Sequence, residues 1–291
     1  MQDTEFLSLV FSVPLEFEDA LQGYFLVNHE PQGFEEAANG TFLVHILKAE
    51  WTPEAEASFD EFVKSLGTND VKLEEIKTYQ NKDWNEQWEA GIEPLRISDD
   101  LVIAPSWRLT EAAAMGATHL IKIDPKMSFG TGHHETTRLC LRMIEHLDCR
   151  GKRVMDLGSG TGILAMYTMM RGATHAVAID TDEWAFSNAK ENCERNGFSS
   201  ETIDLRLGDL ASTTKPDEKF DLIIANIHRN VLLVIADQIA AHQSPGGALV
   251  LSGILEYDAD EIMTPYIAAG YAFIDRAQEN EWVCLRFAYT K

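Results

Sequence analysis

The stretch V-M-D-L-G-S-G-T-G-I-L at residues 154–164 decides the fold. Its apolar start predicts a buried strand, and three glycines then lead into the first turn of a helix. Gly158, Gly160 and Gly162 allow the backbone to approach a ligand closely and let the helix pack on the sheet. The pattern favours a nucleotide-type site over the alternative, an ordinary strand-to-helix turn.

The spacing of these glycines separates two kinds of cofactor. A dinucleotide fingerprint reads G-x-G-x-x-G and would need a third glycine at the position of Ile163. Here the spacing is G-x-G-x-G, and Asp156 lies two residues before the first glycine. A carboxylate there would repel a pyrophosphate but suits a ligand that carries an ammonium and a sulfonium. The turn therefore favours S-adenosylmethionine over NAD.

Apolar runs repeat on the C-terminal side and predict the rest of the sheet. Near-continuous apolar runs are typical of strands buried on both faces of a parallel sheet. They occupy 154–157, 176–180, 202–207, 220–226 and 247–253, with helical stretches at 182–196 and 230–241. From residue 133 onward, helices and strands are expected to alternate strictly. We predict a Rossmann-like, doubly wound α/β sheet as the core of a domain over 127–291.

Polar residues follow three of these predicted strands. Asp180 ends the second strand, 24 residues after Asp156, where a ribose diol can donate hydrogen bonds to it. Asp209 follows the third and can accept from an adenine amino group, although a solvated loop acid is the alternative. Asn226 closes the fourth, where its amide can accept from an incoming amine and aim the amine lone pair at a methyl group. The alternative for Asn226 is a residue that satisfies a turn.

The N-terminal residues predict a separate small domain over 1–80. Strands are expected at 4–13, 33–38, 40–48 and 70–77, and helices at 16–27 and 52–67, with Thr52 as N-cap and Pro53 at the first helical position. This βαββαβ order indicates a ferredoxin-like α+β fold. Residues 81–126 are predicted to be a linker and junction, in which Trp84 and Trp88 pack on one helical face and short strands follow near 95–104 and 119–123.

Composition limits the function. The net charge is −23 over 291 residues, and residues 1–80 alone hold 16 Asp and Glu against 4 Lys and Arg, or −12. The electrostatic field of such an acidic surface repels nucleic acid and attracts a basic partner. The alternative is that the acidic residues merely aid solubility. No apolar run approaches the roughly 20 residues of a membrane span. We therefore expect no membrane contacts. The four cysteines lack a C-x-x-C spacing, so we expect reduced thiols and a cytoplasmic protein.

Four motifs together resemble one family. The glycine turn is similar to that of class I S-adenosylmethionine-dependent methyltransferases. The combination of F-G-T-G-x-H-x-T-T (129–137), D-L-G-S-G-T-G-I-L-A (156–165), A-N-I (225–227) and L-S-G-I-L (251–255) resembles the PrmA family, which methylates the eleventh protein of the large ribosomal subunit. The resemblance runs from the acidic N-terminal residues through W-N-E-Q-W and L-V-I-A-P-S-W to the C-terminus.

The resemblance implies an N-terminal domain that recognises the ribosomal protein, a mobile linker, and a catalytic domain that methylates amines. These would be lysine side chains, the N-terminal α-amine, or both. Motif by motif it places cofactor contacts on Thr137, Gly158, Asp180 and Asn226. The chain departs from the usual loop G-T-G-T-H-P-T-T at His133 and Glu135.

The loop M-S-F-G-T-G-H-H-E-T-T-R at 127–138 is then a lid over the methionine end of the cofactor, with flexible points at Gly130 and Gly132. Asn226 orients the amine, and His134 is a candidate base. The full set of predicted cofactor contacts is Phe129, Gly130, Thr131, Thr137, Asp156, Gly158, Gly160, Gly162, Asp180, Asp209 and Asn226.

Three alternatives remain. One is a methyltransferase of another protein or of a small amine, and a second is a non-catalytic S-adenosylmethionine-binding regulator. The third is a zinc hydrolase built on His133, His134 and Glu135, but adjacent histidines point apart on a regular element and no further cluster completes a site, so we predict no metal. The expected partner is the free, basic ribosomal protein, bound by a monomer.

Overall fold

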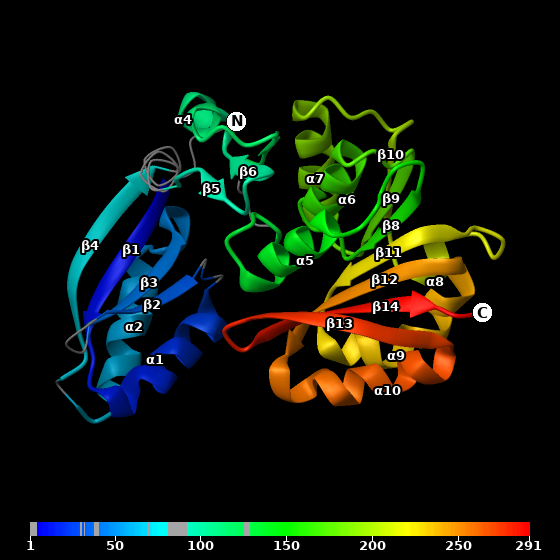
Figure 1. Ribbon diagram of the computed structural model, residues 1–291. Helices are drawn as coiled ribbons and strands as arrows, with labels where there is room; N and C mark the ends of the chain where they lie inside the picture. Colours follow the sequence, from blue (N-terminus) through cyan, green and yellow to red (C-terminus); the bar gives the residue numbers. More distant parts are fainter. Residues whose placement is uncertain are drawn as a thin grey trace. The chain divides into compact units, whose positions relative to one another are not determined.

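The computed structural model describes residues 5–29, 31, 33–37, 41–68, 70–80, 92–124 and 129–291. The chain forms two compact units, Met1–Ile92 and Glu93–Lys291 (Figure 1). Residues 93–124, which fall in the predicted junction, belong to the second unit. The W-N-E-Q-W motif with Trp84 and Trp88 lies outside the described residues.

The first unit is a four-stranded antiparallel sheet with two helices. In chain order its elements are β1 (Glu5–Ser12), α1 (Leu15–Asn28), β2 (Gly33–Ala37), β3 (Thr41–Leu47), the short η1 (Lys48–Glu50), α2 (Pro53–Ser65) and β4 (Lys72–Gln80). The strand order is β2-β3-β1-β4. This is the ferredoxin-like topology that the βαββαβ order predicts.

Local sequence explains these elements. Thr52 caps α2 by accepting a hydrogen bond from the backbone N–H of Ala55, and Pro53 occupies the first turn, where its missing N–H costs nothing. Side chains of β3 alternate between buried and half-buried positions, as expected for a strand with one face on the core. Phe11, Phe25 and Phe59 meet in that core with ring centroids 5.1–5.9 Å apart.

The second unit begins with a small three-stranded sheet in the order β5-β6-β7. Its elements are β5 (Leu95–Arg96), β6 (Leu101–Ala104), η2 (Ser106–Arg108), α4 (Leu109–Ala114) and β7 (His119–Lys122). The short strands predicted near 95–104 and 119–123 are therefore present.

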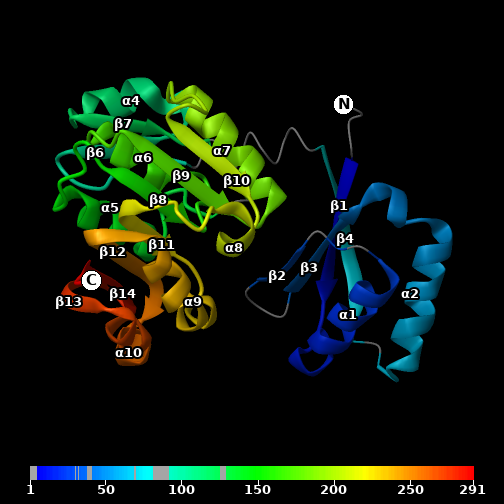
Figure 2. The same cartoon turned by 90° about the vertical axis from the view of Figure 1, so that its right-hand side faces the viewer.

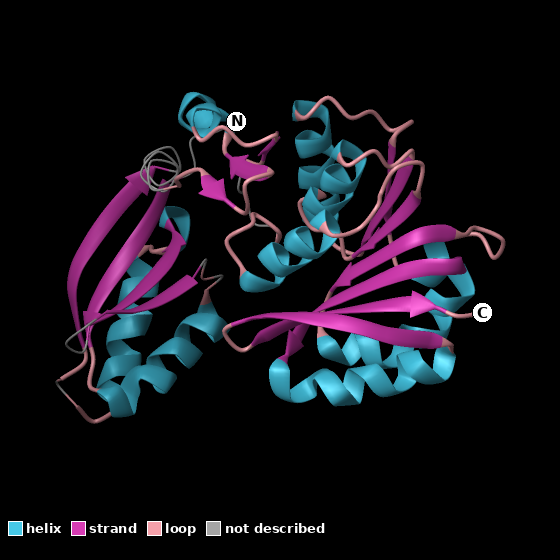
Figure 3. Ribbon diagram, viewed as in Figure 1, coloured by secondary structure: helices cyan, strands magenta, loops and turns pink. Residues whose placement is uncertain are grey.

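A seven-stranded sheet forms the body of the second unit, in the order β10-β9-β8-β11-β12-β14-β13 (Figures 1 and 3). The strands β8 to β12 are parallel, and β14 runs antiparallel to both β12 and β13. The elements are α5 (Glu135–Glu145), β8 (Arg153–Leu157), α6 (Ile163–Met170), β9 (His175–Asp180), α7 (Glu183–Arg195), β10 (Ile203–Leu207), α8 (Leu210–Thr213), β11 (Phe220–Asn226), α9 (Arg229–His242), β12 (Gln243–Leu255), η3 (Glu256–Asp258), α10 (Ala259–Ala269), β13 (Tyr271–Glu279) and β14 (Trp282–Tyr289).

Helices cover both faces of this sheet. Figure 2 shows α9 and α10 on one face and α5, α6 and α7 on the other. Successive residues of a strand alternate between the two cores: Val154 and Ile224 pack with α5 and α6, whereas Met155 and Ile223 pack with α9 and α10. This two-sided burial is why the strands appear in the sequence as unbroken apolar runs.

The predicted strict alternation of helices and strands is wrong at the C-terminus. After β13 the chain turns through Asn280 and Glu281 directly into β14, with no helix between the two strands. Glu279 and Trp282 form the last pair of this hairpin. A two-residue connection is too short for the helical crossover that parallel neighbours require. The hairpin places β14 antiparallel inside an otherwise parallel sheet. No described helix has the length and apolar character to cross a membrane.

Candidate functional site

A cavity of about 750 Å³ lies at the carboxyl ends of β8, β9, β10 and β11. Sheet order reverses between β8 and β11, and ligands of open α/β sheets bind at such a switch point. The lining includes six of the residues predicted from the sequence: Phe129, Gly158, Gly160, Asp180, Asp209 and Asn226.

The glycine turn is built for close approach. Gly158 and Gly160 adopt φ values of 72° and 53°, which L-residues with side chains rarely adopt. A Cβ on Gly158 would lie 2.1 Å from Cγ2 of Ile227, and one on Gly160 would lie 2.3 Å from the carbonyl oxygen of Phe129. Both positions therefore need glycine. Gly162, which begins α6 as its N-cap, also has a positive φ of 78°.

Backbone donors hold the Asp180 carboxylate in place at the end of β9. Its Oδ2 accepts from the backbone N–H of Gly160 at 2.8 Å, and its Oδ1 accepts from that of Asp182 at 3.0 Å. A carboxylate has about four acceptor positions. Asp180 can therefore accept further hydrogen bonds from a hydroxylated ligand without leaving this geometry.

Asp156 lies beneath the turn and not in the cavity lining. Its side chain is fully buried, and Oδ2 accepts from the backbone N–H of Ala165 in α6 at 3.0 Å. Burial raises the pKa of Asp156 to about 7, and the nearby charge of Asp180 acts in the same direction while the Ala165 bond opposes it. Its Oδ1 has no hydrogen-bond partner among the described residues. The structure shows Asp156 supporting the start of α6, while the predicted ligand contact stays a prediction.

Asn226 ends β11 and lines the cavity. Its Oδ1 is buried and lacks a partner in the described part of the chain. A buried carbonyl oxygen without a hydrogen bond is costly, so native proteins seldom keep one that has no ligand or water to bind. Asn226 thus supplies an acceptor that is available to a donor entering the cavity.

Asp209 serves as the N-cap of α8. Its Oδ1 accepts from the backbone N–H and the hydroxyl of Ser212, at 2.8 and 2.6 Å. These bonds, the hydroxyl first, hold the pKa of Asp209 below its ordinary value. Because Asp209 also lines the cavity, its carboxylate can contact a ligand in addition to capping the helix.

The loop that begins at Phe129 is fastened to the glycine turn by Thr161. The Thr161 N–H donates to the carbonyl of Phe129 at 2.9 Å, and its hydroxyl donates to the carbonyl of Gly130 at 2.7 Å. Gly130 and Gly132 are buried, and a Cβ on Gly132 would lie 2.5 Å from Cδ1 of Ile103. The glycines predicted as flexible points are needed here for close packing.

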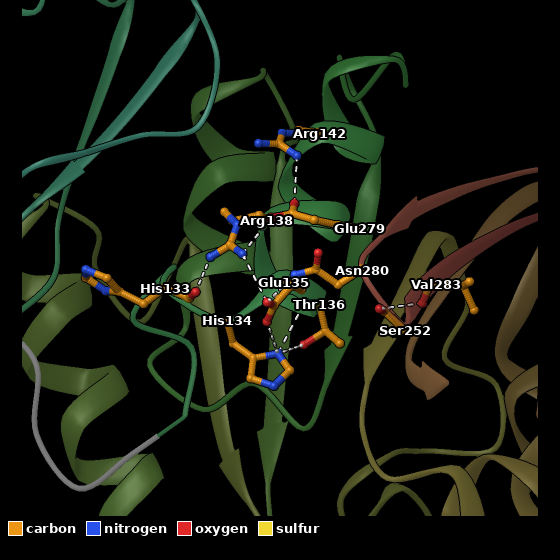
Figure 4. Close-up of polar contacts among 10 residues, drawn as sticks. All are labelled: His133, His134, Glu135, Thr136, Arg138, Arg142, Ser252, Glu279, Asn280 and Val283. Carbon is orange, nitrogen blue, oxygen red and sulfur yellow. Dashed lines mark hydrogen bonds and ion pairs between the residues drawn. The ribbon is translucent and has the colours of Figure 1, made fainter. Parts of the chain in front are cut away.

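His134 and Thr137 lie in the α5 region, outside the cavity lining. Nδ1 of His134 caps α5 by accepting from the backbone N–H of Thr136 at 3.2 Å (Figure 4). The His134 ring lies between Phe129 and Trp282, with centroid distances of 5.1 and 5.0 Å. The Thr137 hydroxyl is buried and has no partner among the described residues. Thr131 lies beside the loop histidine His133, with 3.4 Å between Oγ1 and Nδ1.

Sequence reasoning missed several lining residues that directly follow strand ends: Thr181, Asp182, Ile227 and His228. Asp182 caps α7 by accepting from the backbone N–H of Trp184 at 2.7 Å, and His228 caps α9. These residues could have been found from the sequence, because they directly follow the predicted strands A-V-A-I-D and I-I-A-N. Within the described ranges, no three His, Cys, Asp or Glu side chains converge as metal ligands.

This fold and site define a class I S-adenosylmethionine-dependent methyltransferase, in which the glycine turn follows strand β8 beside the switch point. The family model described as ribosomal protein L11 methyltransferase (PrmA) matches residues 15–290. The chain belongs to this family.

Similar proteins agree with that assignment. A ribosomal protein L11 methyltransferase from Symbiobacterium thermophilum is 36% identical over 81% of this chain and 78% of its own length. Another, from Marinobacter nauticus, is 38% identical over 76% of this chain and 70% of its own. The crystal structure of a ribosomal protein L11 methylase from Lactobacillus delbrueckii subsp. bulgaricus matches with a TM-score of 0.63 and 28% identity, over 69% of this chain and all of that one.

The residues present fit S-adenosylmethionine, the methyl donor of this class. The turn at Gly158 and Gly160 brings the backbone to the cavity wall without side chains, and Asp180 presents a fixed carboxylate to hydroxyl donors. Asn226 presents an unpartnered buried acceptor on the same cavity.

Proposed function

We propose that this methyltransferase modifies amines of ribosomal protein L11, on lysine side chains, on the N-terminal α-amine, or on both. The observation that carries the proposal is the unpartnered, buried Oδ1 of Asn226 at the edge of the cavity. An amide oxygen there suits an N–H donor, and the substrate named for the matching family is a protein.

The cofactor would be held by residues of the cavity. Asp180 would accept from the ribose hydroxyls, Asp209 from the adenine amino group, and the backbone of Gly158 and Gly160 would allow close approach. Phe129, a residue that is 52% exposed, would lie over the bound cofactor as part of the loop fastened to Thr161. When bound, S-adenosylmethionine supplies an electrophilic methyl group on a sulfonium.

Asn226 would act on the acceptor amine. By accepting one N–H hydrogen bond it fixes the direction of the nitrogen lone pair, and such alignment supplies much of the acceleration in an in-line displacement. The amine must first lose its proton. Since an α-amine has a reference pKa of about 7.7–8.0 and lysine one near 10.4, the rate on lysine should rise more steeply at high pH.

The first unit would recognise the substrate. Residues 1–80 carry −12, and a positively charged ribosomal protein would be attracted to them before it assembles with RNA. We therefore propose that the free protein is the substrate, taken by a monomer. The reaction would take place in the cytoplasm, where the four buried free cysteines stay reduced.

The decisive experiment incubates the purified chain with labelled S-adenosylmethionine and free ribosomal protein L11, and maps the methyl groups by mass spectrometry. Methylated amines on L11 support the proposal, and their absence overturns it. Assembled ribosomes serve as the comparison, because faster labelling of ribosomes would contradict a free substrate. Raising the salt to about 0.5 M should raise KM for the protein but not for the cofactor.

A further inference from the structure

One carboxylate joins the β13–β14 hairpin to α5. Glu279, the last residue of β13, accepts from Nε and Nη2 of Arg138 through Oε1, at 2.8 and 2.6 Å. Its Oε2 accepts from Nη1 of Arg142 at 2.8 Å. Figure 4 shows both guanidinium groups turned toward this carboxylate. The hydrogen bond from Arg138 first, and then the two positive charges, keep the pKa of Glu279 below its ordinary value, so the group is ionised.

The Arg138 guanidinium also reaches the loop. Its Nη1 donates to the backbone carbonyl of His133, while its other two nitrogens stay on Glu279 (Figure 4). The Arg138 side chain is only 15% exposed, so water competes little for these bonds. A planar guanidinium fixes all three bonds at once, which a lysine ammonium does less well.

The same loop is fastened to the glycine turn at its other end. Phe129 and Gly130 accept hydrogen bonds from Thr161. Gly160, the residue before Thr161 in the turn, donates its backbone N–H to the cavity residue Asp180. A continuous set of contacts therefore runs from Glu279 through Arg138 and the loop to the wall of the cavity.

A second, independent set of contacts connects the hairpin to the loop. Trp282, which starts β14, packs edge-on against His134 at 5.0 Å, and His134 packs against Phe129 at 5.1 Å. In the hairpin turn, the side-chain amide of Asn280 donates to Glu135 at 3.0 Å. Three residues of the hairpin tip, Glu279, Asn280 and Trp282, thus contact the loop or the first turns of α5.

We infer that Glu279 is a positioning residue for the cofactor: through Arg138 it holds the loop 129–134 against the glycine turn and so sets the place of Phe129 in the cavity wall. The inference rests on the proposed cofactor site and is independent of the proposed protein substrate. Loss of the Glu279 charge should loosen the loop and weaken cofactor binding, whereas alignment of the amine by Asn226 should stay intact.

The test compares Glu279→Gln with Asp275→Asn. Asp275 also lies on β13 and pairs with Arg286 across the same hairpin, at 2.8 Å between Oδ1 and Nε, but has no bond to α5 or the loop. The substitution at Glu279 should raise the dissociation constant for S-adenosylhomocysteine and KM for S-adenosylmethionine by roughly fivefold, with kcat within about twofold. Exchange of the Thr161 amide hydrogen should become faster. The substitution at Asp275 should change none of these quantities.

A second variant keeps the test valid if Glu279→Gln folds poorly. Arg138→Lys retains a positive charge for Glu279 but loses the fork that reaches His133, so it should weaken cofactor binding in the same way. Equal effects of the Glu279 and Asp275 substitutions, or unchanged cofactor binding in both Glu279→Gln and Arg138→Lys, would overturn the inference. If the wild-type chain itself fails to bind S-adenosylhomocysteine by calorimetry, the proposed cofactor site fails instead.

Discussion

The backbone N–H of Gly160 donates to Oδ2 of Asp180 at 2.8 Å, and this bond ties the glycine turn after β8 to the end of β9. One carboxylate thereby orders the turn and faces the cavity at the same time. Because the turn and the carboxylate are joined, a change at either residue affects the other.

Replacing Asp180 by alanine should therefore weaken S-adenosylmethionine binding by about ten- to hundredfold. The variant loses the proposed acceptor for ribose and frees the N–H groups of Gly160 and Asp182, and hydrogen bonds to a charged group are worth about 1.5–3 kcal/mol. Calorimetry with the cofactor measures the effect. Asp204→Asn is the control, because Asp204 pairs with Arg206 on β10 outside the cavity lining. Unchanged affinity in Asp180→Ala would rule out its role.

Gly160→Ala should abolish cofactor binding and destabilise the fold. The new Cβ would lie 2.3 Å from the Phe129 carbonyl oxygen at a φ of 53°, so both the loop and the turn must shift. Gly197→Ala is a matched control, since Gly197 also has a positive φ, 79°, but nothing within 4 Å of a Cβ. We expect the control to lose about 1 kcal/mol of unfolding free energy and to keep its cofactor affinity. Denaturant titrations measure the loss of stability, and calorimetry measures the loss of cofactor affinity. Similar losses of affinity in both variants would contradict the need for close backbone approach at Gly160.

The sequence predicted the sheet well because its strands are buried on both faces. Continuous apolar runs such as F-D-L-I-I-A-N identify strands whatever their neighbours are. The same property hid the hairpin. Three consecutive residues of β14, Val283 to Leu285, are buried, so this antiparallel strand has the pattern of a parallel one. Only the two-residue turn at Asn280 marks its direction.

The site was predictable to the extent that it follows strand ends. Asp180 and Asn226 close β9 and β11, and both line the cavity. Asp156 lies within β8, where side chains alternate between the two faces. It shares the face of Val154, toward α6, which explains its bond to Ala165. The bonds of Glu279 to α5 link residues 141 and 137 positions apart, and no local pattern encodes them.

Asn226→Ala should separate activity from stability. The substitution removes an amide oxygen that is buried without a partner, so the free energy of unfolding should stay the same or rise. Turnover should fall by about a hundredfold or more if Asn226 aligns the amine as proposed. Cofactor affinity should fall less than kcat.

Single-turnover rates and thermal melts measure this pair of effects. Asn230→Ala is the control, because Asn230 is exposed near the start of α9, outside the cavity lining, and should leave turnover unchanged. A variant at Asn226 with wild-type kcat would remove the basis for its role in aligning the amine.

The pH dependence of stability should report the buried carboxyl of Asp156. Burial raises its pKa from 3.8 to about 7 in the folded chain. Between these values the folded state keeps a proton that the unfolded state has released. This group's contribution to stability is therefore complete below about pH 4 and is lost as the pH rises through 7, with a slope of at most about 1.4 kcal/mol per pH unit.

Asp156→Asn cannot ionise and can still accept from the Ala165 N–H. Compared with the wild type, the variant should therefore gain unfolding free energy from pH 5 to about 7 and level off by pH 8, as measured by denaturant titrations at each pH. All other titrating groups are the same in both proteins, so the difference isolates this carboxyl. A difference that stays constant over this range would show that Asp156 is already ionised in the folded chain at pH 5.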